Sequence, residues 1–427
     1  MKTNNLLSAK ATLLTILILF GVSRSSNASS FIASFSGNWS NASNWDGGRP
    51  GFDISSNDNV VIPSGVTLVL DADLTVNGNL TLNGGSLNLN GKNLTIIGGI
   101  TSIGLGSLIG NKSSNITFNG FGGAGNLVFA SGSQVINNLT INIGANSGMF
   151  LGSGLTVAGT LTLTNGFLAI GNYNLLIAGK GSIQGGSSSS YVMNNGTGSL
   201  MIAIPNNDMP FVFHVGTQNN YAPVAITNNS TSSGVFAVSA QEGVLALGTS
   251  GNDMCDAQRM VNTSWNVSSS IADNTNIKLE LFWNTNMQVN GFNNTQAYMS
   301  QYTSTGWNTA EATTATLNSN GSFSLKLEGV TSLTQFAVFG KSSTTGIKNV
   351  AADASFNLYP NPATQTINIE VAATTNFPIL KIFDVAGNQV ISQQVENNVT
   401  SLDINGLSRG VYFASLNGAA ATKFIKE

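Results

Sequence analysis

The chain has 427 residues, and only 8% of them are charged, against roughly 25% in an ordinary globular protein. Its formal net charge is −3, which disfavours a nucleic-acid ligand because such ligands require a basic face. The single cysteine, Cys255, permits no internal disulfide and is expected to be a buried small hydrophobe. The length allows two to four domains, which β-ladders and packing must stabilise.

Residues 1–28 are predicted to be a signal peptide. Lys2 and Lys10 precede or flank an apolar stretch, Ala11–Val22, and Ser26-Asn27-Ala28 forms a small-x-small cleavage site. The apolar stretch is too short for a bilayer, which takes about twenty residues. We therefore expect no transmembrane segment in the mature chain. Its 13 Lys and Arg against 19 Asp and Glu would give a net charge of about −6, because the peptide carries three of the 16 cations.

Residues 29–190 are predicted to form a β-solenoid with an N-terminal tryptophan cap. Trp39 and Trp45 lie six residues apart among Gly, Asn and Ser, in a segment similar to the N-terminal cap of bacterial surface β-solenoids. Terminal repeats need atypical covering residues, which favours a cap. Contact between these two indole rings and a sugar is the alternative.

The solenoid prediction depends on apolar triplets that recur with Asn-Gly or Gly-Gly between them. Each places two apolar side chains inward and one Thr or Asn outward, and three intervals, from Leu74 to Leu94, advance 20 residues, about one rung. Leu74–Gly98 also aligns without gaps on Leu155–Gly179, with 13 of 25 positions identical at an offset of 81, which indicates stacked rungs. The outward rows repeat regularly only at Thr160–Thr164, so we expect solvated faces rather than an ordered array.

The sequence predicts no catalytic residues. Between Leu74 and Asn207 there is no Asp or Glu, whereas glycoside hydrolysis needs paired carboxyl groups and lyases need acids that hold Ca²⁺. His214, the one histidine, lies in an apolar strand and is expected to be partly buried with a satisfied ring, rather than a base for Cys255 or a serine. A polysaccharide hydrolase or lyase with acids in the central region is the less favoured alternative.

No metal site or cofactor is predicted, although structural Ca²⁺ is kept as an alternative. One His and one Cys cannot build a zinc site, whereas Asp and Asn oxygens suit Ca²⁺. Acidic clusters occur at Asp53–Asn59, at Asp71 and Asp73, and at Asp253 and Asp256. None has EF-hand or nonapeptide spacing, so turn formation is the favoured role.

Residues 191–341 are predicted to be a β-sandwich, followed by a polar linker at 342–355. The strands lengthen there, as in Pro210–Gly216 and Asn276–Trp283, and their spacing suits a sandwich. Trp265 and Trp283 alternate with apolar neighbours, as core residues do. The candidate ligand contacts for a glycan are Trp39, Trp45 and Trp307.

Residues 356–427 are predicted to be a small immunoglobulin-like β-sandwich of about seven short strands. They contain, in order, LYPNPA (Leu358–Ala363), DVAGNQV (Asp384–Val390), LSRGVYF (Leu407–Phe413) and KFIKE (Lys423–Glu427). This set resembles the C-terminal sorting domain of proteins exported by the type IX secretion system of Bacteroidetes-type bacteria. Asn388 departs from the family, where Lys or Arg often follows the glycine. The central region is similar to a module common among such proteins, for which no activity is implied.

The resemblance implies a location and two partners. The tail would be recognised by the secretion translocon and removed by a sorting peptidase within residues 342–355. The mature chain would then be secreted or attached to the outer cell surface, having passed through the periplasm. The residues assigned to sorting by motif are Tyr359, Pro360, Asn361, Pro362, Gly387, Gly410, Tyr412 and Lys423.

For the mature chain we expect a non-catalytic, adhesive or structural role at the cell surface. An extracellular glycan-binding protein is the alternative. A cell-surface glycolipid or an extracellular polysaccharide would be the partner.

Overall fold

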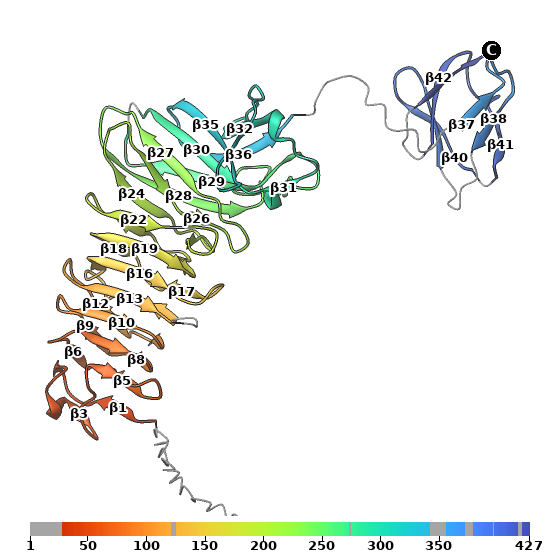
Figure 1. The fold of residues 1–427 in the computed structure, drawn as a ribbon. Helices are drawn as coiled ribbons and strands as arrows, with labels where there is room; N and C mark the ends of the chain where they lie inside the picture. The colour runs from red at the N-terminus through yellow and green to blue at the C-terminus, as the bar shows by residue number, and fades with distance from the viewer. Residues whose placement is uncertain are drawn as a thin grey trace, which may run out of the picture. The chain divides into compact units, whose positions relative to one another are not determined.

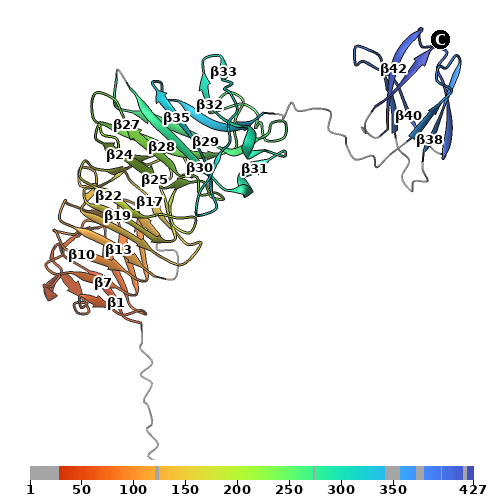
Figure 2. The same cartoon turned by 45° about the horizontal axis from the view of Figure 1, so that its top comes forward.

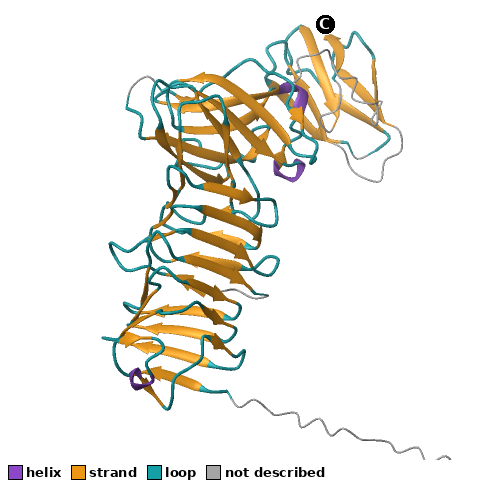
Figure 3. Ribbon diagram, turned by 60° about the vertical axis from the view of Figure 1, so that its left-hand side comes forward, coloured by secondary structure: helices purple, strands orange, loops and turns teal. Residues whose placement is uncertain are grey.

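The structure is a computed structural model that describes residues 28–120, 125–272, 275–341, 356–371, 379–395, 397–416 and 421–427. It is built almost entirely of β-strands (Figure 3), and the predicted all-β fold with an N-terminal solenoid is confirmed. The chain divides into two compact units, Met1–Ser342 and Ser343–Glu427, here called the solenoid–sandwich unit and the sorting unit. The predicted linker at 342–355 and all but Ala28 of the predicted signal peptide lie outside the described residues, so both remain predictions.

Stacked parallel strands form the solenoid (Figure 1, Figure 2). The first sheet contains β1 (Ser30–Ala33), β3 (Trp45–Asp46), β5 (Asn59–Pro63), β8 (Asn79–Asn83), β11 (Gly99–Ile103), β14 (Gly125–Leu127), β17 (Gly148–Leu151), β20 (Phe167–Ala169), β23 (Val192–Met193) and β26 (Val215–Gly216). The second contains β4 (Asp53–Ile54), β7 (Leu74–Val76), β10 (Asn93–Ile96), β13 (Asn115–Asn119), β16 (Asn138–Asn142), β19 (Thr160–Asn165) and β22 (Ser182–Gly185).

Two further sheets complete the rungs, the third in the early part of the solenoid and the fourth in the later part. The third contains β2 (Gly37–Asn38), β6 (Thr67–Val69), β9 (Ser86–Asn88) and β12 (Ser107–Ile109). The fourth begins with β15 (Val135–Ile136), β18 (Leu155–Val157), β21 (Leu175–Ile177) and β24 (Leu200–Ile204).

The fourth sheet does not stop at the solenoid but continues into the central sandwich. Its further strands are β28 (Gly234–Glu242), β29 (Met260–Ser269), β36 (Gln335–Gly340), β32 (Ala297–Thr303) and β33 (Gly306–Trp307), with β31 (Gln288–Val289) beside β29. The facing fifth sheet contains β25 (Pro210–Phe213), β27 (Val224–Asn228), β30 (Ile277–Trp283), β35 (Phe323–Val330) and β34 (Thr316–Leu317). Three short 3-10 helices, Ala42–Asn44, Thr285–Met287 and Asn294–Gln296, are the helical elements of the described residues.

The rung length predicted from the triplets is confirmed for the first full rung and then increases. Leu94 lies beside Leu74, 20 residues earlier, and Ile116 beside Leu94, 22 residues earlier. Parallel pairing also extends past the predicted boundary at residue 190, because β23 pairs with β26 through Val192 and Val215. The solenoid is therefore longer than the sequence predicted.

The 81-residue repeat is not a whole number of rungs, contrary to our interpretation. Four successive pairings carry the second sheet from Leu74 to Leu161, which is 87 residues. Leu74 therefore lies in the second sheet, while its aligned partner Leu155 lies in the fourth. Equivalent triplets occupy different sides of the rung because the later rungs are longer.

The outward face of the second sheet is more regular than expected. Its register places Thr75, Thr95, Thr117, Thr140 and Thr162 side by side on five successive strands. The prediction that outward threonines align only at Thr160–Thr164 is therefore wrong. The variable rung length conceals this column in the sequence.

One core runs through the solenoid and the sandwich. The inward side chains of the triplets, such as Leu80 and Leu82, are fully buried, and the same buried cluster extends to Trp265 and Val338 in the sandwich. Parallel strand β24 pairs antiparallel with β28, for example through Leu200 and Val238. The two regions predicted as separate domains therefore share both a sheet and a core.

A tryptophan pair covers the N-terminal end of this core. Trp39 and Trp45 are 0% and 6% exposed and meet edge to face with ring centroids 4.9 Å apart. The indole N–H of Trp39 donates to the Gly51 carbonyl, and that of Trp45 donates to the Trp39 carbonyl. Neither ring is available to a sugar, so their candidacy as ligand contacts is wrong, and their placement matches the cap interpretation.

The sorting unit consists of a three-stranded and a four-stranded sheet with their own core around Ile369, Ile382 and Phe424. The strands are β37 (Phe356–Tyr359), β38 (Thr366–Val371), β41 (Val399–Asp403), and β40 (Gln389–Gln394), β39 (Ile379–Phe383), β42 (Gly410–Leu416), β43 (Thr422–Lys426).

Substituting Trp39→Ala should destabilise the solenoid–sandwich unit by about 3–5 kcal/mol, because the change empties a fully buried aromatic site. Urea unfolding would measure the loss. Leu105→Ala is the control, because Leu105 is 88% exposed and surface changes stay within about 0.5 kcal/mol. Unchanged stability in the Trp39 variant would contradict a cap.

Candidate functional site

The first and last motifs of the sorting unit are fastened to each other. The Asn361 side chain accepts a hydrogen bond from the Ile425 amide (2.9 Å) and donates one to the Lys423 carbonyl (3.2 Å). The Ala363 amide also donates to the Ile425 carbonyl at 2.8 Å. LYPNPA and KFIKE thus form one structural feature along β43.

Gly387 lies in a turn built around one carboxylate. Its φ of +85° is a conformation that favours glycine. Asp384 accepts hydrogen bonds from the Ala386 and Asn388 amides (2.9 Å each) and from the Asn388 side chain (3.0 Å). The bonds from Asn388 are the main cause of the lowered pKa of Asp384. Asn388, where relatives carry a cation, thus binds the same carboxylate through its amide.

The other sorting residues divide into core and surface. Tyr412 is 8% exposed, donates its hydroxyl to the Ser408 carbonyl (2.9 Å) and stacks on Phe424, which resembles the tyrosine corner of immunoglobulin-like folds. A Cβ at Gly410 would meet only the Tyr412 ring, at 3.9 Å, so sterics do not explain this glycine. The exposed members, open to a partner, are Tyr359, Pro360, Asn361, Pro362 and Lys423.

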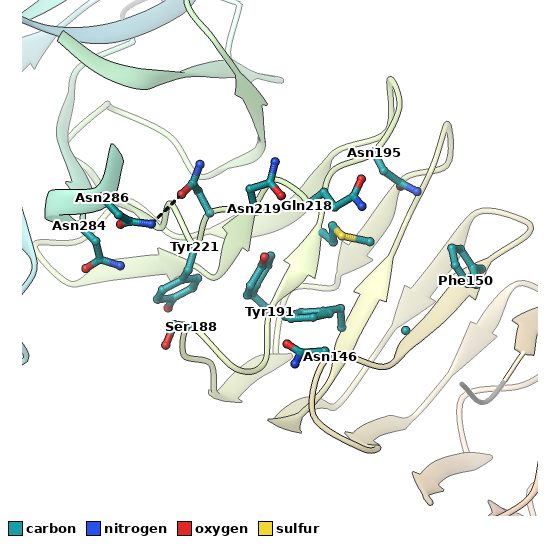
Figure 4. Close-up of a pocket in the computed structure, with 14 residues that line it drawn as sticks. Asn146, Phe150, Ser188, Tyr191, Asn195, Gln218, Asn219, Tyr221, Asn284 and Asn286 are labelled. Carbon is teal, nitrogen blue, oxygen red and sulfur yellow. Dashed lines mark hydrogen bonds between the residues drawn. The ribbon is translucent and has the colours of Figure 1, made fainter. Parts of the chain in front are cut away.

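A separate candidate site lies in the other unit, where the solenoid meets the sandwich. It is a cleft of about 570 Å³, here called the junction cleft (Figure 4). Every residue that lines it is uncharged at neutral pH. The lining residues are Asn146, Gly148, Phe150, Phe167, Ser188, Tyr191, Met193, Asn195, Gln218, Asn219, Asn220, Tyr221, Asn284 and Asn286.

Aromatic rings run along the cleft. Tyr191 is 2% exposed, and its ring centroid lies 4.7 Å from that of Phe167 and 5.5 Å from that of Tyr221. Its hydroxyl donates to the Thr217 carbonyl at 2.7 Å. Tyr191 therefore supports two half-buried rings from behind. Phe150 is 51% exposed and offers an open ring face at one end (Figure 4).

Close packing at a glycine permits this arrangement. A Cβ at Gly216 would lie 2.6 Å from the Tyr191 ring and 2.4 Å from the Asn220 carbonyl oxygen. The sequence thus places a residue without a side chain where the ring and the loop Gln218–Tyr221 approach the sheet.

Side-chain amides form the polar part of the lining. Asn286 donates to Asn220 at 3.3 Å (Figure 4), and Asn219 donates to both carboxylate oxygens of Glu242. Among the described residues, the amide groups of Asn146 and Gln218 have no protein partner. These two amides are free to donate to and accept from a ligand.

A second hollow of about 420 Å³ adjoins the first and shares Ser188, Tyr221 and Asn284 with it. It is also lined by His214 and by Trp283, whose indole N–H is buried and, within the described part of the chain, lacks a partner. The His214 Nδ1 and the Tyr221 hydroxyl are 2.5 Å apart and hydrogen-bonded. A buried polar group without a partner is uncommon, so this N–H is a candidate donor to a ligand.

Burial keeps the titratable groups of both hollows neutral. It lowers the pKa of His214 to about 4 and raises that of Tyr221. It also raises the pKa of Tyr191 to about 12, with a smaller contribution from the charge of Glu242. The site is therefore uncharged across the physiological pH range. His214 is partly buried and hydrogen-bonded, as predicted.

The remaining predicted candidates lie elsewhere. Trp307 is half-buried, donates its indole N–H to the Leu245 carbonyl at 2.8 Å, and packs edge-on against Tyr302 and Phe339; it does not line the cleft. Cys255 is only partly buried rather than buried. The sequence missed the cleft, although the run Gln218-Asn219-Asn220-Tyr221 was an available sign of it.

The acidic clusters bind protein hydrogen atoms. Asp58 accepts from the Ser29 amide, Asp253 accepts from the Cys255 amide, and Asp73 accepts from the Asn93 amide and side chain. These bonds lower the pKa of Asp73. Within the described ranges, no three His, Cys, Asp or Glu side chains come close enough to share a metal ion.

Comparison with known proteins identifies one part of the chain. Residues 357–427 match the family described as the secretion system C-terminal sorting domain, which confirms the prediction for the tail. No curated protein and no solved structure matches the chain. Among the described residues, the structure has no helix that is both long and apolar enough to cross a membrane.

Acid should weaken the solenoid–sandwich unit through His214. Its pKa is about 4 in the fold and 6.5 in the unfolded chain, so the unfolded state binds more protons between these values and stability falls as pH falls through that window. Thermal unfolding at pH 7 and at pH 4.5 would measure it. The loss should be smaller in His214→Gln and should persist in Tyr221→Phe, which keeps the buried imidazole. An equal loss in both variants would contradict this assignment.

Proposed function

We propose that the solenoid–sandwich unit acts outside the cell as a non-catalytic adhesive protein that makes its contacts through the junction cleft. The sorting domain implies export by the type IX secretion system and a secreted or cell-surface location. The observation that carries the proposal is the lining of the cleft, in which aromatic rings and amides are combined with no charged residue.

The distribution of acids supports a role without catalysis. No carboxylate occurs from Leu74 to Asn207, which covers most of the solenoid. The acid nearest to the cleft in the hydrogen-bond network is Glu242, and the Asn219 amide occupies both of its oxygens. A hydrolase needs two carboxyl groups about 5–9.5 Å apart across the substrate. The lining of the cleft contains none.

The solenoid itself supports a structural part of the role. The second sheet has seven strands, which at about 4.8 Å per strand extend ~30 Å. Because one core joins these rungs to the sandwich, the solenoid is suited to act as a rigid spacer. Glycan binding, the second candidate function, is favoured by the open ring of Phe150 and the unpartnered amides.

Export should depend on the sorting unit. Deleting residues 357–427 should leave the chain in the periplasm, because the part that resembles sorting domains is lost. Immunoblots of periplasm and medium would measure the distribution. Asn361→Ala removes the side-chain bonds to β43 and should lower the exported fraction, whereas Thr400→Ala, on the surface strand β41, serves as the control. Wild-type secretion of the deletion variant would refute the assignment.

Adhesion should depend on the cleft and proceed without turnover. In the secreted chain, Phe150→Ala should lower retention on producing cells or their extracellular matrix by about tenfold, because an aromatic contact contributes roughly 1.4 kcal/mol. Leu105→Ala, an exposed apolar residue outside the cleft, should have no effect. Release of reducing sugars from the matrix, or full retention of the Phe150 variant, would contradict the proposal.

A further inference from the structure

We propose that the junction cleft binds an internal stretch of an uncharged polysaccharide chain, with pyranose rings lying against Phe150 and Tyr221. The inference rests on the proposed function, because it assumes that the cleft is the contact surface. It goes further by naming the chemical class of the ligand and the manner in which it enters the site.

The class follows from the lining. A pyranose ring has an apolar C–H face, which suits the open face of an aromatic ring, and hydroxyl groups that both donate and accept. Side-chain amides also do both, and Asn146 and Gln218 are free to do so among the described residues. A carboxylated or sulfated sugar would lose hydration without gaining a countercharge, which is costly. The lining therefore favours neutral sugars.

The manner of binding follows from the order of the residues. In Figure 4, Phe150 and Asn284 lie at opposite ends of the drawn residues, with Tyr191 and Tyr221 between them. The two hollows share Ser188, Tyr221 and Asn284, and their volumes are about 570 and 420 Å³. Each volume alone lies in the range of a small-molecule site. One sugar unit would leave most of this space empty, whereas a chain that passes Tyr221 contacts both hollows.

The unsatisfied indole N–H supports the second hollow as part of the site. Trp283 is fully buried, lines this hollow, and has no partner for its N–H within the described residues. Asn320 and Ser322 line the same hollow and add an amide and a hydroxyl. Polar groups therefore continue beyond Tyr221, in the direction that a bound chain would take.

Isothermal titration of the purified full chain with a length series of neutral oligosaccharides, from monosaccharide to hexasaccharide, tests the inference. Gluco-, manno- and xylo-series should be compared with a galacturonate series as the charged control. For at least one neutral series, affinity should rise with length by about tenfold or more and then level off. The galacturonate series should bind at least about tenfold more weakly, because a buried unpaired charge is unfavourable.

Matched variants place the binding. Phe150→Ala and Tyr221→Ala should each weaken the hexasaccharide at least about tenfold, whereas Phe150→Tyr keeps a ring and should bind nearly as the parent. Tyr221→Phe separates the ring from the hydroxyl bonded to His214. Phe150 is half exposed, so its variants should fold, and equal melting temperatures would verify this.

The outcomes separate this inference from the proposed function. A charged series that binds more tightly, or a monosaccharide that binds as tightly as the hexasaccharide, overturns the inference while the cleft remains the contact surface. The same holds if no neutral series binds but Phe150→Ala still abolishes retention on cells. If neither binding nor retention responds to Phe150, both proposals fail.

Discussion

The structure depends on closing the two ends of a stack of parallel strands. The first and last strands of any such stack expose unpaired backbone groups and open core, which invite aggregation. At the N-terminal end, β3 pairs antiparallel with β1, and Trp39 and Trp45 cover the core. At the other end, β24 passes its free edge to the antiparallel strand β28. The sandwich is thus the second cap of the solenoid.

The same closure places the candidate site. Because the fourth sheet continues from the solenoid into the sandwich, the loop Gln218–Tyr221 is held beside β20 and β23 of the first sheet. The rings of Phe167, Tyr191 and Tyr221 then contact one another in sequence. These rings come from segments on both sides of residue 190, where the sequence predicted a domain boundary. The cleft is therefore a product of the junction and exists in neither part alone.

Local chemistry made part of this predictable. Alternating apolar triplets require one buried face, and Leu80, Leu82 and Leu94 are buried accordingly. The four motifs of the tail identified the sorting domain. The aromatic pair Trp39 and Trp45 was interpretable because a solenoid end needs a cover. Each of these predictions concerns residues near one another in the chain.

What the sequence concealed depends on register over long separations. Rungs of 20 and 22 residues follow one another, so the threonine column and the change of side between Leu74 and Leu155 appear only in three dimensions. The cleft depends on contacts such as that of Tyr191 with Tyr221, which no periodicity encodes. Trp307 was a reasonable candidate by type, yet its N–H is bound within the protein. Residue type alone did not indicate which aromatic rings remain open.

The central claim is that the junction cleft is the contact surface of the exported chain. Hydrogen–deuterium exchange on the full chain, with and without a neutral polysaccharide, measures this most directly. The account predicts that added protection appears together in the segments around Phe150 and Gln218–Tyr221, with no change around Trp39. Protection confined to the N-terminal cap, or to the region around Trp307, would contradict it.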